Sequence, residues 1–156
     1  GAMKLGKLSP YPGYTGDLMV EGVLSMIQPP QREAPLTMSY QLRGLDPRCA
    51  PSSGQMPTKA NACGIHVHEG YSCEEAGGHL YASDIIAVDP WTTITALQSE
   101  DGSAISPSQV VSPLGLPPSE LIGRAFVIHD FEGARISCGI VYASKTDQCW
   151  VGMPHT

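Results

Sequence analysis

The sequence predicts an all-β domain, either a β-sandwich or a flattened Greek-key barrel. Glycine (17) and proline (14) are scattered through the 156 residues as breaks between short apolar runs, which is typical of strands and turns. No segment keeps a helical period beyond about one turn. Only 15% of the residues are charged and 42% are hydrophobic, so the chain can bury a core.

Six runs have the composition of strands, and we expect seven or eight strands in all. A helical turn is predicted at 117–121, where two prolines stand at its start. Long loops are expected at 46–61 and 70–89, and loops of this kind often carry function. The predicted strands are 18–27, 36–42, 65–68, 93–97, 122–129 and 136–142.

Length and charge limit the organisation and the partners. We predict a single domain over 1–156, with Gly1, Ala2 and Met3 as a cloning remnant. The net charge of −6 and the lack of a basic run argue against nucleic acid or a membrane surface as partner. No run approaches the roughly 18 apolar residues of a membrane-spanning helix.

Histidines are the candidate metal ligands. His66 and His68 are two residues apart on a predicted strand, so their imidazoles share one face about 7 Å apart. That spacing suits one metal ion, although two polar residues on a solvated face explain the pair alone equally well. His79 follows two glycines, and His129 ends an apolar strand where a buried imidazole would need a partner.

The order and spacing of several motifs resemble the copper-zinc superoxide dismutase family over nearly the whole chain. This resemblance implies an eight-stranded Greek-key β-barrel, in agreement with the strand count above. It also implies one copper ion per domain, held by His66, His68, His79 and His129. The matching segments are 16–22, 64–70, Cys73, 78–79, 123–129 and 133–139.

The same resemblance assigns roles to other residues. It implies that Arg135 guides the superoxide anion to copper and that Cys73 and Cys138 form a disulfide. It implies that His79 detaches from Cu(I) and carries a proton. A fixed cation near a metal raises the encounter rate of a small anion, which gives the arginine a physical task.

Two departures point to the copper-only branch of the family. No histidine lies between His79 and His129, so no zinc site is expected, since a closed zinc site needs four ligands. The long electrostatic loop of the family is reduced to 130–134, which predicts a solvent-open copper. The segments 63–70 and 89–91 most resemble the copper-only superoxide dismutase-repeat proteins, so the chain is a candidate for one domain of a longer protein.

The implied function is disproportionation of superoxide to dioxygen and hydrogen peroxide. Asp89 is the candidate partner that orients His79 in place of zinc, with a simple turn-opening aspartate as an equal alternative. Two other functions stay open: a copper-binding or copper-delivery module with little turnover, and a barrel used only for protein contacts. A monomer is expected, because copper-only members of the family are commonly monomeric.

Five cysteines leave at least one without a partner in the chain. By strand parity with His66, Cys63 is predicted to face the interior as a free thiol. Cys49 and Cys149 are then predicted to form a second disulfide at the far end of the barrel. Disulfides in a small β domain favour an oxidising compartment, and we therefore expect secretion.

Overall fold

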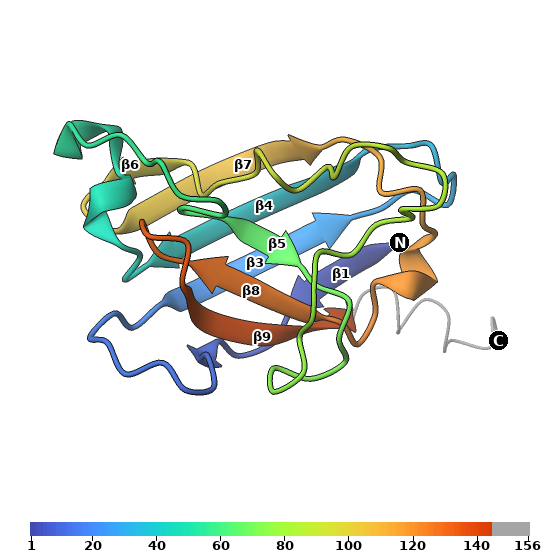
Figure 1. Cartoon of the computed structure of the whole chain (residues 1–156). Coiled ribbons are helices and arrows are strands. Elements are labelled where there is room, and N and C mark those ends of the chain that lie inside the picture. The colour runs from blue at the N-terminus through green and yellow to red at the C-terminus, as the bar shows by residue number, and fades with distance from the viewer. Residues whose placement is uncertain (145–156) are drawn as a thin grey trace, which may run out of the picture.

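The computed structural model describes residues 1–144. Its strands form one antiparallel, strongly curled sheet that makes a half-barrel (Figure 1). The nine strands are β1 (Ala2–Leu5), β2 (Ser9–Pro10), β3 (Glu21–Ile27), β4 (Leu36–Arg43), β5 (Ile65–Val67), β6 (Gln98–Glu100), β7 (Ser103–Val111), β8 (Ala125–His129) and β9 (Arg135–Ala143). Three short 3-10 turns complete the structure: η1 (Pro47–Cys49), η2 (Pro51–Ser53) and η3 (Pro118–Glu120).

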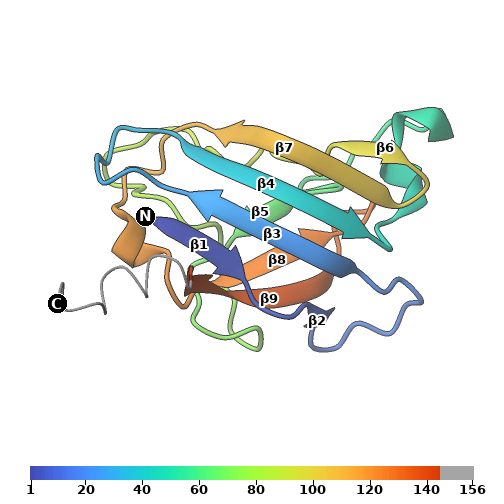
Figure 2. The same cartoon turned by 180° about the vertical axis from the view of Figure 1, so that it is seen from behind.

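Eight strands follow one another along the sheet in the order β5-β8-β9-β1-β3-β4-β7-β6, and β2 pairs with β9 beside this path. The sheet folds over itself: β5, β8 and β9 lie in front of β3 and β4 in Figure 1 and behind them in Figure 2. The apolar core fills the space between these two halves. Both halves therefore supply inward side chains to one continuous core.

Alternation of side chains explains why each half buries one face. In β4, Leu36, Met38, Tyr40 and Leu42 are buried, and the residues between them point outward. Trp91, the largest fully buried side chain among residues 1–144, donates its indole N–H to the Leu80 carbonyl at 2.8 Å. Burial of this indole therefore leaves no unpaired donor.

Five of the six predicted strands are confirmed, although β3 and β8 begin three residues later than predicted. The sixth is wrong, and β1, β2, β6 and β7 were not predicted. Residues 93–97 do not form a strand: a turn covers 91–93, and Thr95 makes only an isolated bridge with Gly64. The nine-residue β7 was not predicted, because Ser106 is buried while Ile105 and Val110 are exposed, which breaks the expected alternation, and because Pro107 interrupts the run. The predicted helical turn corresponds to η3.

The first residues of the chain belong to the fold. Met3 is 1% exposed and lies in β1, which pairs with both β3 and β9. Gly1 also contributes, because its carbonyl accepts a hydrogen bond from the Gln28 N–H at 3.0 Å. The segment interpreted as a cloning remnant is therefore structured.

Candidate metal centre

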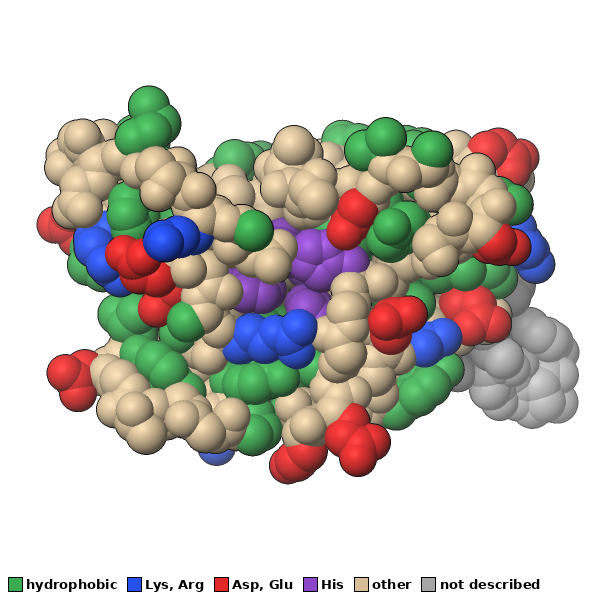
Figure 3. Space-filling view, viewed as in Figure 1, with side chains coloured by type: hydrophobic (Ala, Val, Ile, Leu, Met, Phe, Trp, Pro, Cys, Tyr) green, Lys and Arg blue, Asp and Glu red, His purple; other side chains and the backbone are tan. Residues whose placement is uncertain are grey.

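Three histidines form a buried cluster at the ends of two neighbouring strands. His66 lies in β5, His68 directly follows β5, and His129 ends β8, which pairs with β5. They offer ligand atoms that all lie within 4.8 Å of one another, and all three residues are at most 3% exposed. Figure 3 shows the histidines as one patch on this face, with basic side chains bordering it. Within residues 1–144 this is the one such group of three or more potential ligands.

Backbone carbonyls fix the orientation of two of these rings. His66 Nε2 lies 2.8 Å from the Ile94 oxygen, and His68 Nδ1 lies 2.8 Å from the Gly77 oxygen. A carbonyl only accepts, so each of these nitrogens must carry the proton. The lone pairs are therefore on His66 Nδ1 and His68 Nε2, which are both buried without any hydrogen-bond partner.

His129 is held in the same way by Gly64. The Gly64 oxygen accepts from the backbone N–H of His129 at 2.9 Å and from its Nδ1 at 3.2 Å. A Cβ at Gly64 would also overlap the His66 ring, so only glycine fits there. The lone pair of His129 is consequently on Nε2, and one glycine shapes the positions of two histidines.

Burial keeps the three imidazoles neutral. Desolvation, with neighbouring histidines adding to it, lowers the pKa of His66 to about 2. Desolvation also lowers the pKa of His68 and of His129 to about 4, and the nearby Arg135 charge contributes to both shifts. Metal ligation requires neutral imidazole, so the cluster is in the ligating form at neutral pH.

The two buried nitrogens without hydrogen-bond partners show whether a metal ion would fit among these histidines. Buried polar atoms in proteins are nearly always paired, and an unpaired one costs free energy. Here two of them lie in a cluster of three neutral imidazoles, a donor set that suits copper, zinc, iron or nickel. The cluster therefore fits a transition-metal ion, and the donor set does not decide which.

His79 lies at the edge of this cluster and is held differently. It forms an isolated antiparallel bridge with His68, and its ring centroid lies 4.4 Å from that of His66 and 5.0 Å from that of His68. Its Nδ1 lies 2.6 Å from Asp89 Oδ2, while Asp89 Oδ1 accepts the Trp91 N–H at 2.8 Å. The structure thus brings all four predicted ligands together and places Asp89 against His79.

Arg135 is joined to the cluster through a shared acceptor. Its Nη2 donates to the Gly77 oxygen at 2.7 Å, the same oxygen that accepts from His68. Its Nη1 donates to the Tyr11 hydroxyl at 3.0 Å. Neither Gly77 nor Tyr11 was predicted to contribute, although the glycine pair before His79 was a visible signal. Gly77 has φ +70°, a conformation that favours glycine.

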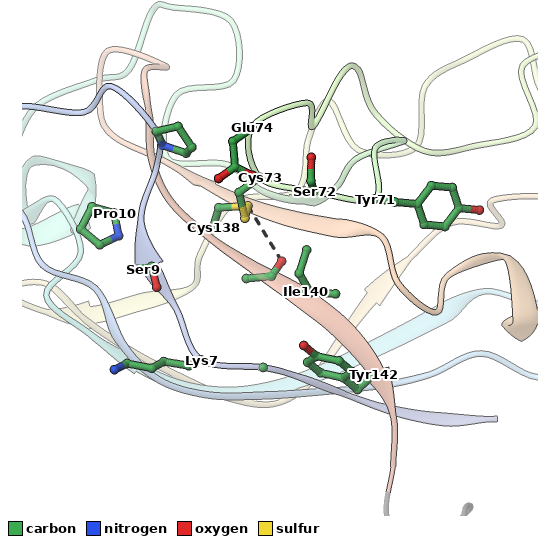
Figure 4. Close-up of a pocket in the computed structure, with 13 residues that line it drawn as sticks. Lys7, Ser9, Pro10, Tyr71, Ser72, Cys73, Glu74, Cys138, Ile140 and Tyr142 are labelled. Carbon is green, nitrogen blue, oxygen red and sulfur yellow. Dashed lines mark hydrogen bonds between the residues drawn. A yellow bond between two sulfur atoms is a disulfide. The ribbon is translucent and has the colours of Figure 1, made fainter.

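The predicted disulfide between Cys73 and Cys138 is present. It links the loop after β5 to β9 and lies beside a pocket that Lys7, Glu74 and Tyr142 help to line (Figure 4). No histidine lines this pocket, so it is separate from the histidine cluster.

The second disulfide corrects two predictions. Cys63 is bonded to Cys49, so it is not a free thiol and Cys49 does not pair with Cys149. The parity argument failed because Cys63 precedes β5 in a left-handed conformation, with φ 61°, so strand alternation does not apply to it. Cys149 itself lies outside the described residues.

Asp46 anchors the loop that follows His129. It is 3% exposed and accepts hydrogen bonds from the Arg48 side chain at 2.7 Å and from the Phe131 N–H at 2.9 Å. Burial alone would raise the pKa of Asp46, but the bonds from Arg48 and Phe131 outweigh it and the pKa is lowered. The Cys49–Cys63 disulfide lies within the connection between β4 and β5 that carries Asp46. The Cys63 N–H donates to the Asp130 oxygen at 2.8 Å and so ties this connection to the loop after His129.

Two disulfides indicate an oxidising environment. Within the described residues, no helix is long and apolar enough to cross a membrane. Compared with models of known protein families and with curated protein sequences, the chain matches none.

Proposed function

We propose that this protein is a copper-only superoxide dismutase with a Greek-key barrel of the superoxide dismutase type. The observation that carries the proposal is the cluster of His66, His68 and His129, in which two buried imidazole nitrogens have no partner. His79 supports it as the fourth ligand at the edge of the cluster. Together with the sequence resemblance, this set favours copper and no zinc.

Copper bound here would supply the redox chemistry, accepting an electron from one superoxide and returning it to a second, with two protons, to give dioxygen and hydrogen peroxide. The remaining work belongs to the chain. Arg135 attracts the anion toward the cluster. Asp89 accepts a hydrogen bond from the His79 Nδ1–H, which leaves His79 Nε2 as the atom that would either ligate or carry a proton.

A copper-binding or copper-delivery module with little turnover is the second candidate. Two observations favour it: the net charge of −6 opposes the approach of an anion, and residues 130–134 form only a short connection between β8 and β9. Binding of copper without fast turnover would distinguish this candidate from the enzyme.

The decisive experiment combines metal content with turnover. Metal-free protein is loaded with copper and zinc, its metals are measured by elemental analysis, and superoxide dismutation is assayed on the same sample, with His79→Ala as control. One copper, no zinc and fast turnover support the enzyme. One copper with slow turnover supports the binding module, and stoichiometric zinc contradicts the copper-only assignment.

The same resemblance extends to the surroundings of the domain. We propose that the protein is secreted and monomeric, and that the domain occurs either alone or within a chain of repeats. Mass measurement of the natural protein from cell supernatant and from lysate tests the location and the length together.

A further inference from the structure

Arg135 differs from the other well-anchored arginines of the described chain in what holds it. Arg43, Arg48 and Arg124 each form an ion pair with a carboxylate, which offsets their charge. The hydrogen bonds of Arg135 go instead to the Tyr11 hydroxyl and the Gly77 carbonyl. Both acceptors are neutral, so the guanidinium is fixed in place while its positive charge is left available to an anion.

We propose that Tyr11 is a positioning residue that holds the Arg135 guanidinium against the histidine cluster. The inference rests on the proposed function, since it concerns how an anion reaches that site. The two bonds leave from different nitrogens, Nη1 to Tyr11 and Nη2 to Gly77, so together they set the plane of the group. The guanidinium carbon also lies 5.6 Å from the centroid of the Tyr11 ring.

The chain builds a firm support for Tyr11. β2 pairs with β9 through Ser9↔Cys138 and Pro10↔Ser137, and the Tyr11 N–H continues this pairing to the Ile136 oxygen at 3.0 Å. The ring packs against a small buried cluster formed by Ala76, Ala125, Val127 and Cys138. The hydroxyl is therefore fixed by both backbone and ring contacts before it meets Arg135.

Loss of the Tyr11 hydroxyl should make the Arg135 guanidinium more mobile without removing its charge. In Tyr11→Phe the ring and its packing stay, but Nη1 loses its acceptor and the guanidinium can turn about its remaining bond to Gly77. The charge still attracts anions at long range, so the dependence on ionic strength should persist. Binding at short range should weaken, because it needs a fixed geometry.

The test compares Tyr11→Phe with Tyr14→Phe and Arg135→Ala. Tyr14 is the matched control, because its hydroxyl also accepts one hydrogen bond, from the Leu18 N–H at 3.0 Å, and does not contact Arg135. In metal-free protein, NMR measures rotation of the Arg135 guanidinium about its Cζ–Nε bond. In copper-loaded protein, azide titration followed by the visible copper spectrum measures anion affinity at several salt concentrations.

We expect Tyr11→Phe to speed guanidinium rotation and to weaken azide binding, each by roughly three- to tenfold, with the salt dependence retained. Arg135→Ala should weaken azide binding more and flatten its salt dependence, whereas Tyr14→Phe should change neither measurement. Equal behaviour of Tyr11→Phe and Tyr14→Phe in both measurements would overturn the proposal. Neither readout requires turnover. If the protein binds copper but does not dismutate superoxide, the proposed enzyme function is wrong, and the two measurements still test the role of Tyr11.

Discussion

The three strand histidines and His79 lie within one cluster but are held by different means. Backbone carbonyls orient His66, His68 and His129, whereas the Asp89 carboxylate orients His79. The strand residues are buried, and the His79 side chain is 10% exposed on a loop. A backbone acceptor can change only if the main chain moves, while a side-chain acceptor can follow a ring. The geometry thus separates three fixed candidate ligands from one that has more freedom to move.

Among the changes considered, removal of a histidine held by a backbone carbonyl should have the largest effect on copper affinity. We expect His129→Ala to lower copper affinity more than about 100-fold and His79→Ala only about 10- to 100-fold, because the first variant breaks the buried set of three. Competition with a copper chelator measures both affinities. Equal losses would contradict the division into fixed and mobile ligands, and circular dichroism checks that both variants fold.

Acid should destabilise the metal-free protein because His66, His68 and His129 are buried in the neutral form. In the unfolded chain histidines take up protons near pH 6.5, whereas in the folded chain His68 and His129 stay neutral down to about pH 4 and His66 to about pH 2. The unfolded state therefore binds more protons as the pH falls, and stability decreases through this window. Each imidazole contributes up to about 1.4 kcal/mol per pH unit.

Urea midpoints measured between pH 7 and pH 5 test this slope. His129→Gln cannot take up the proton, so we expect its free energy of unfolding to fall less steeply than that of the wild type. If the free energy of unfolding falls with pH equally steeply in the two proteins, His129 does not contribute to the acid sensitivity. The window stops at pH 5 because carboxylates titrate below it.

The two disulfides should differ in what their loss affects. Cys73–Cys138 closes a separation of 65 residues and Cys49–Cys63 one of 14, so the chain-entropy estimate gives about 4 and about 3 kcal/mol of stability. Serine pairs at each site, compared by thermal unfolding, test this order. Only the Cys49/Cys63 pair should also weaken copper binding, because Cys63 precedes the Gly64 carbonyl that orients His129.

Asp89→Asn should give the smallest effect and act on the mobile ligand alone. An amide that keeps the Trp91 contact through its oxygen presents N–H to His79 Nδ1, which moves the ring proton to Nε2 and removes the lone pair there. We expect about tenfold weaker copper binding, measured by the same chelator competition. Asp84→Asn, a change in the same loop away from His79, serves as control. Equal copper affinities for the two variants would show that Asp89 does not orient His79.

Patterns in the sequence identified what depends on periodicity and spacing. Alternating apolar residues predicted β4, and His-x-His placed two histidines on one face, as found for His66 and His68. Positions set by unusual backbone or by distant partners could not be predicted in this way. Strand alternation did not apply to Cys63 because its φ is positive. Tyr11 contacts Arg135 only because β2 pairs with β9.

The curled sheet ends in strands of only three residues, β5 and β6, and this has a consequence for self-association. Exposed strand edges are templates for pairing with other chains. The edge of β5 is covered by its own loop, since the Leu80 N–H donates to the Val67 oxygen at 2.9 Å and the Ile65 N–H to the Ile94 oxygen at 3.3 Å. β6 ends at the exposed Glu100. It pairs only with Ser103 and Ala104, so within the described residues most of the nine-residue β7 has no strand on that side, and Pro107 removes one backbone donor from it. The two ends of the curled sheet therefore limit intermolecular strand pairing by different means, a covering loop at β5 and a proline in β7.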